Sequence, residues 1–170
     1  AFAVCCVGNC SEVKNHAALL QAVAEVRRRR PVRLLHAGTG PEEAAERRLA
    51  DALDLGADVT FLGQVDDVAP ALFAADCFAM PSLHEGLGIA AMEALATGLP
   101  AVLADVPGLR SLDHPDALIR WAPPDAAAFA AALEAVAADP PPDAARRQQA
   151  ATVHRTFGPD EPVALLLRWY

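Results

Sequence analysis

Short apolar runs alternate with longer segments of helical periodicity along most of this sequence. Six such runs, rich in Val, Leu, Ala and Cys, predict β-strands. They are Ala3–Val7, Val32–His36, Val59–Leu62, Cys77–Met80, Ala101–Ala104 and Ala117–Arg120. Five of the six runs are followed by a segment with the apolar spacing of a helix, which is the order of βαβ units. The pattern therefore predicts an α/β fold in which a parallel sheet is covered by helices on both faces.

The helices expected after these strands are His16–Arg29, Pro41–Leu55, Val68–Ala74, Leu87–Thr97 and Asp125–Ala138. Three consecutive prolines, Pro140–Pro142, end the last of them. Beyond the prolines, two shorter helices are expected at Asp143–His154 and Asp160–Tyr170. We interpret the proline run as a turn between helices, so that residues 1–170 form one domain.

The composition agrees with a folded domain. Of the 170 residues, 54% are hydrophobic and 21% are charged, which supplies enough apolar surface for a sizeable core. The formal net charge of −8 disfavours broad adhesion to nucleic acid or to anionic lipid. No apolar stretch is long enough to span a membrane, and no export signal opens the sequence. A strand-like run begins almost at Ala1, so we expect a further domain upstream of this segment.

Cysteine and histidine show no metal-binding spacing. The four cysteines, at positions 5, 6, 10 and 77, form no C-x2-C pair and are expected to be buried thiols in a reducing cytoplasm. The five histidines lie at positions 16, 36, 84, 114 and 154, and we expect each to be a surface or loop residue rather than a ligand. Only His84, beside Glu85, is of interest. The sequence therefore predicts no metal site.

Two glycine-containing loops follow predicted strands, where ligands bind in an open parallel sheet. In the first, Gly38 and Gly40 are followed by Pro41 and two glutamates. These acids at a helix start would repel a phosphate, so this loop is interpreted as a tight turn with at most a backbone role.

The second loop, Pro81–Gly88, leads into a helix whose first turn lacks acidic residues. Its glycines allow close backbone approach, and the free N–H groups and helix dipole suit an anion such as pyrophosphate. Glu93 lies further along this helix, on a face that is otherwise apolar, and is expected to need a partner from the protein or from a ligand.

Basic residues offer one further candidate. Lys14 is the only lysine beside 13 arginines, and it lies in the loop after the first strand. A compact ammonium suits a phosphate, whereas a solvated surface lysine is the alternative. The run Arg27–Arg30 ends a predicted helix, where cations complement the dipole, and is interpreted as a solvated face.

These residues, taken together, resemble the retaining glycosyltransferases of family 4, also called group 1. Glu85 and Glu93 match the E-x7-E motif of that family, flanked by Pro81-Ser82 and by Gly98-Leu99-Pro100. Matching motifs continue from about Val7 to Leu112. The resemblance implies the carboxyl-terminal, donor-binding Rossmann-like lobe of a two-lobed GT-B enzyme, with the amino-terminal acceptor domain absent from this chain.

The resemblance also implies roles for individual residues. Lys14 would contact the donor phosphates, Glu85 the hydroxyls of the transferred sugar, and Glu93 the ribose hydroxyls, with Lys14 and Glu85 as the catalytic residues. Backbone or side-chain contacts to the donor are expected at these further positions: Gly8, Asn9, Gly38, Gly40, Gly63, Gln64, Val65, Gly86, Leu87 and Gly88. Many members carry Arg where this chain has Asn9, which would place more of the phosphate binding on Lys14.

The activity that the resemblance implies is transfer of a hexose from a UDP-, GDP- or ADP-sugar, with retention of configuration and without a cofactor or metal. The acceptor would be a sugar or a lipid-linked sugar bound through the absent domain, in polysaccharide or glycoconjugate synthesis in the cytoplasm or at the inner membrane face. Two alternatives stay open: a non-catalytic nucleotide-binding module, and another sugar-nucleotide enzyme such as an epimerase or a phosphorylase.

Overall fold

The computed structural model describes residues 1–157, and the helix expected at 160–170 lies outside this range. The described chain folds around a parallel sheet of six strands in the order β3-β2-β1-β4-β5-β6. The strands are β1 (Phe2–Val7), β2 (Val32–Ala37), β3 (Val59–Gly63), β4 (Cys77–Met80), β5 (Ala101–Ala104) and β6 (Ile119–Ala122). The strand order reverses between β1 and β4, which is where an open α/β sheet forms a ligand crevice.

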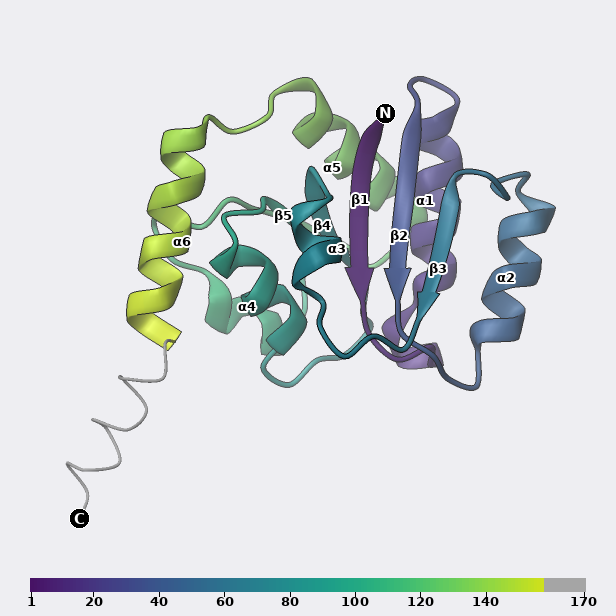
Figure 1. The fold of residues 1–170 in the computed structure, drawn as a ribbon, viewed down its shortest axis with the longest axis horizontal. Coiled ribbons are helices and arrows are strands. Elements are labelled where there is room, and N and C mark those ends of the chain that lie inside the picture. Colours follow the sequence, from purple (N-terminus) through teal and green to yellow (C-terminus); the bar gives the residue numbers. More distant parts are fainter. Residues whose placement is uncertain (158–170) are drawn as a thin grey trace, which may run out of the picture.

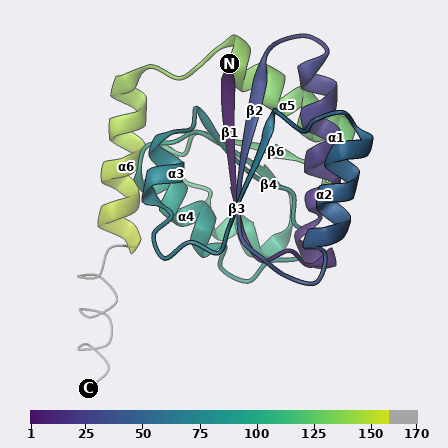
Figure 2. The same cartoon turned by 45° about the vertical axis from the view of Figure 1, so that its right-hand side comes forward.

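Helices cover both faces of the sheet (Figures 1 and 2). The helices α1 (His16–Arg27), α2 (Glu43–Ala52) and α5 (Ala126–Ala138) lie on one face, and α3 (Ala69–Phe73), α4 (Ile89–Ala96) and α6 (Asp143–Phe157) lie on the other. Two short 3-10 helices, η1 (Glu12–Lys14) and η2 (Pro107–Leu112), were not anticipated. The predicted α/β architecture is confirmed.

The burial pattern follows from this layering. The central strands β4 and β5 are buried at every position, because a parallel sheet with helices on both faces has no solvent side. Phe78 of β4 and Phe129 of α5 are the largest fully buried side chains. All four cysteines are buried and free, as expected, and burial raises the pKa of the Cys5 and Cys77 thiols to about 12.

Some predicted boundaries were wrong. The last strand begins at Ile119 rather than Ala117, because the Ala117 N–H closes a turn onto His114. The helix expected from Leu87 begins only at Ile89, because Gly88 has a φ of 65°. The helix expected from Pro41 begins at Glu43. None of the described helices is long and apolar enough to cross a membrane.

The segment after the proline run packs back onto the sheet layers. On α6, the buried Gln149 donates its amide N–H groups to the Leu95 and Leu99 carbonyls at 3.2 and 3.0 Å, and it accepts the Leu118 N–H at 2.6 Å. Arg146 donates to the Gly98 carbonyl at 3.0 Å. Pro140–Pro142 therefore connects two helices of the same folded unit.

Candidate functional site

A cleft of about 330 Å³ opens at the carboxyl ends of β1 and β4, at the reversal of the strand order. Its walls come from the loop after β1 and from the loop that enters α4. The lining residues are Val7, Gly8, Asn9, Lys14, Met80, Glu85, Leu87, Gly88, Ile89 and Ala90. Most residues of these two loops that the sequence analysis singled out are therefore brought together.

The loop after β1 is held against the loop after β4. Asn15 ends η1 with a φ of 55°, a left-handed conformation that asparagine tolerates better than most residues. Its side-chain amide donates to the Pro81 and Pro124 carbonyls at 3.1 and 2.9 Å. The Leu83 N–H donates to the Val13 carbonyl at 2.8 Å. These bonds fix η1, which ends at Lys14, beside the cleft.

Lys14 and Glu85 form an ion pair at the centre of this site. The Lys14 ammonium lies 2.5 Å from Oε1 of Glu85, and their side chains are 23% and 9% exposed. The Ser82 hydroxyl donates to the same Glu85 oxygen at 2.7 Å. An ammonium has three N–H donors, so Lys14 can hold Glu85 and still bind an anion in the cleft.

The amino terminus of α4 forms the opposite wall of the cleft. Gly88 caps the helix in a left-handed conformation, and the first turn contains no acidic residue. The leading N–H groups of a helix lack partners within the helix and carry a partial positive charge. Together with Lys14, this helix start gives the cleft two sources of positive potential, which suits a diphosphate.

The support behind the α4 loop was missed by the sequence analysis. Residues of η2 lie against it so closely that a Cβ added to Gly108 would stand 1.8 Å from the Glu85 carbonyl oxygen. A Cβ at Gly88 would lie 2.4 Å from Cδ2 of Leu109, so that side chain would have to move. The available signal was the Pro107-Gly108 dipeptide, which follows the predicted fifth strand after two residues.

Gly38 and Gly40 support the site without lining the cleft. A Cβ on Gly38, which has a φ of 143°, would lie 1.8 Å from the Gly8 carbonyl oxygen, and one on Gly40 would lie 2.4 Å from that of Cys10. The tight turn expected here is present, and its backbone approaches the β1 loop. Gly63, whose carbonyl accepts the Gly38 N–H at 2.8 Å, stands behind it.

Four further candidates also lie outside the cleft lining. Gly86 is exposed in the loop before α4. Gln64 is exposed and Val65 half-buried, in the loop after β3. Glu93 is exposed on α4, which corrects the expectation of an apolar surrounding. The buried face of α4 is formed by Ala91, Ala94 and Leu95, so Glu93 points elsewhere. Its carboxylate has no hydrogen bond or ion pair within residues 1–157.

The expectation for the histidines was wrong at two positions. His16 on α1 and His36 on β2 are 3% and 1% exposed, and they form a buried cluster with Cys10 and Glu46. Burial lowers the pKa of His16, but Cys6 and Glu46 outweigh it and raise the pKa to about 10. Burial and the neighbouring His16 lower the pKa of His36 to about 4. His84, by contrast, is exposed.

A family model described as glycosyl transferases group 1 matches residues 1–139 of this sequence. The chain belongs to this family. It is 40% identical over 95 residues to the putative glycosyltransferase EpsF of Bacillus subtilis, an alignment that covers 55% of this chain and 25% of EpsF. The chain spans about a quarter of the length of the curated relatives that it matches.

Solved structures of glycosyltransferase lobes share the fold. Sucrose-phosphate synthase from Thermosynechococcus elongatus aligns with a TM-score of 0.83 at 30% identity, over 99% of this chain and 44% of that chain. HepE from Anabaena, solved in complex with UDP, aligns with a TM-score of 0.84 at 21% identity, over 99% and 49%. The family model confirms the predicted family, and the solved structures confirm the predicted GT-B lobe. None of these matches supports the epimerase or phosphorylase alternative.

Proposed function

We propose that this domain holds the nucleoside diphosphate of a sugar donor, and that the whole protein transfers the sugar to an acceptor with retention of configuration. The observation that carries this proposal is the Lys14–Glu85 ion pair opposite the start of α4, in one cleft. Family membership supports it, as does the UDP bound in the HepE structure, which has the same fold.

Each part of the cleft has a role in this proposal. Lys14 and the leading N–H groups of α4 bind the diphosphate and stabilise the charge that develops on it as the sugar leaves. Glu85, oriented by Lys14 and Ser82, accepts hydrogen bonds from sugar hydroxyls. The acceptor hydroxyl attacks the anomeric carbon from the side of the departing phosphate, whose oxygen takes its proton.

Binding without a divalent metal or other cofactor is part of the proposal, because the ammonium and the helix start already supply positive charge beside the phosphates. The acceptor, a sugar or lipid-linked sugar, would be held by a further domain. A cytoplasmic location, including the inner membrane face, is consistent with four free thiols, since reducing compartments keep cysteines unpaired.

Calorimetry with UDP, GDP and ADP, with and without magnesium, tests donor binding directly. Lys14→Ala is expected to weaken binding of the tightest-binding diphosphate by about 1.5–3 kcal/mol, the range for a charged hydrogen bond. Binding of the matching nucleoside is expected to be unchanged. Arg48→Ala is the matched control, because it removes an exposed positive charge on α2, outside the cleft lining. Equal loss for nucleoside and diphosphate would contradict the phosphate role, and binding only with magnesium would contradict the metal-free proposal.

The two glutamates are separated by a second comparison. Glu93→Gln is expected to weaken the binding of every ribonucleotide. In this variant a 2′-deoxynucleotide is expected to lose little further affinity, because the substitution and the missing 2′-hydroxyl impair the same contact. Glu85→Gln is expected to leave plain diphosphate binding nearly intact and to weaken the sugar-bearing donor. An unchanged ribonucleotide affinity in folded Glu93→Gln protein would exclude the ribose contact.

A further inference from the structure

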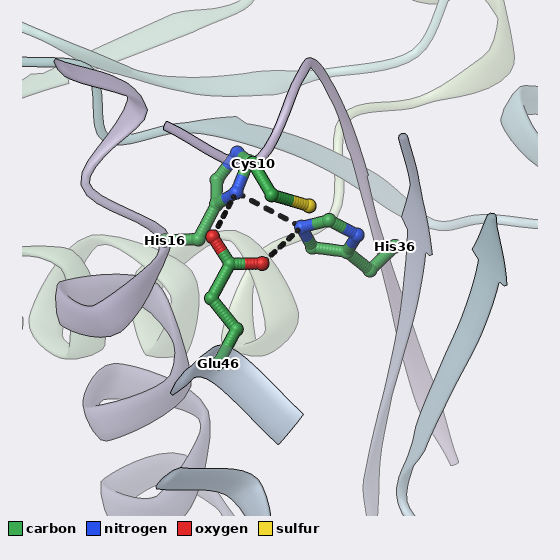
Figure 3. A group of neighbouring side chains, drawn as sticks. All are labelled: Cys10, His16, His36 and Glu46. Carbon is green, nitrogen blue, oxygen red and sulfur yellow. Dashed lines mark hydrogen bonds and ion pairs between the residues drawn. The ribbon is translucent and has the colours of Figure 1, made fainter. Parts of the chain in front are cut away.

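Four side chains that can ligate a metal converge behind the β1 loop (Figure 3). Cys10 follows β1, His16 begins α1, His36 lies on β2 and Glu46 lies on α2. They are 0%, 3%, 1% and 4% exposed. One ligand atom from each lies within 4.8 Å of the others. The fold therefore gathers a thiol, two imidazoles and a carboxylate at one buried point, from the loop after β1 and from α1, β2 and α2.

The distances within the cluster match those around a small tetrahedral cation. His16 Nδ1 lies 2.9 Å from His36 Nε2 and 3.0 Å from Glu46 Oε1. His36 Nε2 lies 3.4 Å from Glu46 Oε2. Zinc with bonds of about 2.0–2.1 Å to nitrogen and oxygen places neighbouring ligand atoms about 3.3 Å apart. The three ligands therefore need only small shifts to surround one ion.

Hydrogen bonds alone leave this cluster incomplete. His16 Nδ1 carries at most one hydrogen, yet it faces both His36 Nε2 and Glu46 Oε1. Placing hydrogens on both ring nitrogens would set two N–H groups against each other at 2.9 Å. Glu46 Oε2 is buried without a hydrogen-bond partner in the described chain, which is costly for a carboxylate. A cation at the centre would satisfy all of these atoms.

We propose that Cys10 Sγ, His16 Nδ1, His36 Nε2 and the Glu46 carboxylate bind one zinc ion. Thiolate and imidazole ligands favour zinc over magnesium or calcium. Four protein ligands leave no open position, which makes the site structural rather than catalytic. On binding, the protons of the Cys10 thiol and of His16 Nδ1 pass to solvent. Thiolate and carboxylate then balance the double charge of the ion, so that the buried site is neutral.

The proposed site lies beside a surface hollow and beside the segment that carries Lys14. His16 and Glu46 border a surface hollow of about 310 Å³, whose walls also carry Glu12 and Glu42 and so attract cations. Cys10 and His16 flank η1, which carries Lys14. Zinc would therefore fix the segment that presents Lys14, although zinc binding itself does not depend on the proposed nucleotide.

The test is metal binding by the full chain after dialysis against a chelator. One equivalent of Zn²⁺ is expected to bind and to raise the unfolding temperature, whereas Mg²⁺ is expected to have no effect. Co²⁺ in place of zinc is expected to give the visible bands of a tetrahedral ion and a thiolate-to-cobalt charge-transfer band. A folded wild-type chain that takes up no stoichiometric zinc, or a cobalt form without the thiolate band, overturns the proposal.

Variants assign the ligands. Cys10→Ser is expected to remove the charge-transfer band, whereas Cys77→Ala, which removes another buried thiol, is expected to keep it. Glu46→Gln preserves side-chain shape and is expected to weaken zinc binding at least about 100-fold, since loss of a group that merely orients a ligand already costs about 10–100-fold. Circular dichroism shows whether the Glu46→Gln variant is folded. If Cys10→Ser fails to fold, zinc binding by folded Glu46→Gln protein tests the proposal in its place. Unchanged zinc affinity in Glu46→Gln overturns the assignment.

Discussion

Replacing Gly108 by alanine tests whether η2 positions the α4 loop. A Cβ at this position would lie 1.8 Å from the Glu85 carbonyl oxygen and 2.5 Å from that of Gly86. Carbon and carbonyl oxygen normally stay about 3.3 Å apart or more, so one backbone segment must move by about 1.5 Å. Because both contacts are to backbone, no side chain can rotate away to relieve them.

Two consequences are expected from this displacement. Overpacking of this kind costs about 1–3 kcal/mol, so the free energy of unfolding in urea should fall by that amount. The displaced loop carries Glu85, and a misplacement of about 1 Å can reduce catalysis about 100-fold. Calorimetry should therefore show weaker binding of the sugar-bearing donor, and the whole protein should lose most of its proposed transfer activity.

Gly56→Ala is the matched control for this experiment. A Cβ at Gly56 would meet nothing within 4 Å, and neither glycine has a positive φ, so the two variants differ in steric contact rather than in backbone strain. Gly56→Ala is expected to keep wild-type stability and donor binding. If Gly108→Ala behaves in the same way in both measurements, the argument that η2 holds the loop is wrong.

Three further predictions concern stability. Asp125→Ala removes the carboxylate that accepts the Ala128 N–H at 2.8 Å at the start of α5, and urea unfolding should show a loss of about 1 kcal/mol. Gln149→Leu removes three hydrogen bonds to backbone groups and leaves the Leu99 carbonyl and the Leu118 N–H without this partner, whereas the Leu95 carbonyl keeps the Gly98 N–H. It should cost more than Asp125→Ala by the same assay. Hydrogen bonds from the Thr152 hydroxyl and Gln148 hold the pKa of Asp116 below its ordinary 3.8. The stability that the ionised Asp116 carboxylate contributes is therefore present above pH 3.8 and is lost on acidification. Asp116→Asn should therefore reduce the fall in the urea midpoint between about pH 5 and about pH 3, and an unchanged fall would contradict this linkage.

The success of the strand predictions has a physical basis. The strands β4 and β5 are buried on both faces, so each reads as an uninterrupted apolar run, and their bounds were predicted without error. The edge strand β6 is only partly buried, and its apolar run continues into the preceding turn at Ala117. Periodicity cannot separate such a turn from the strand, because the deciding bond lies between His114 and Ala117.

The candidate site was predictable only in pieces. An anion site at the start of α4 followed from the glycines of Pro81–Gly88 and from the lack of acids in the first turn of the helix. Lys14 was a candidate phosphate contact because it is the only lysine in the sequence. The ion pair that joins it to Glu85 spans 71 positions, and only the family resemblance placed both residues on one ligand. The spacing of residues within one loop cannot predict a contact between two loops that follow adjacent strands.

The His16–His36 cluster shows what spacing rules for metal ligands overlook. Those rules describe ligands that are close in sequence, whereas these four residues come from a loop, two helices and a strand. A usable signal did exist, because His36 follows Val32, Leu34 and Leu35 in a run predicted to be a buried strand. A polar ring in such a strand needs a buried partner. In the structure, His16 at the start of α1 and Glu46 on α2 lie beside the His36 ring.

The contrast between Glu85 and Glu93 shows how the two roles differ physically. Glu85 is nearly buried and already bound to Lys14 and Ser82, so a sugar hydroxyl must share that carboxylate with existing partners. Glu93 is exposed, and no partner within residues 1–157 competes for it. Glu85→Gln therefore loses a charged partner of Lys14 within the protein, which costs stability, while Lys14 keeps its ammonium for the diphosphate. Replacing Glu93 changes ligand contacts alone. Loss of stability should accompany Glu85→Gln and be absent from Glu93→Gln, so any loss of binding in the latter can be attributed to the ligand.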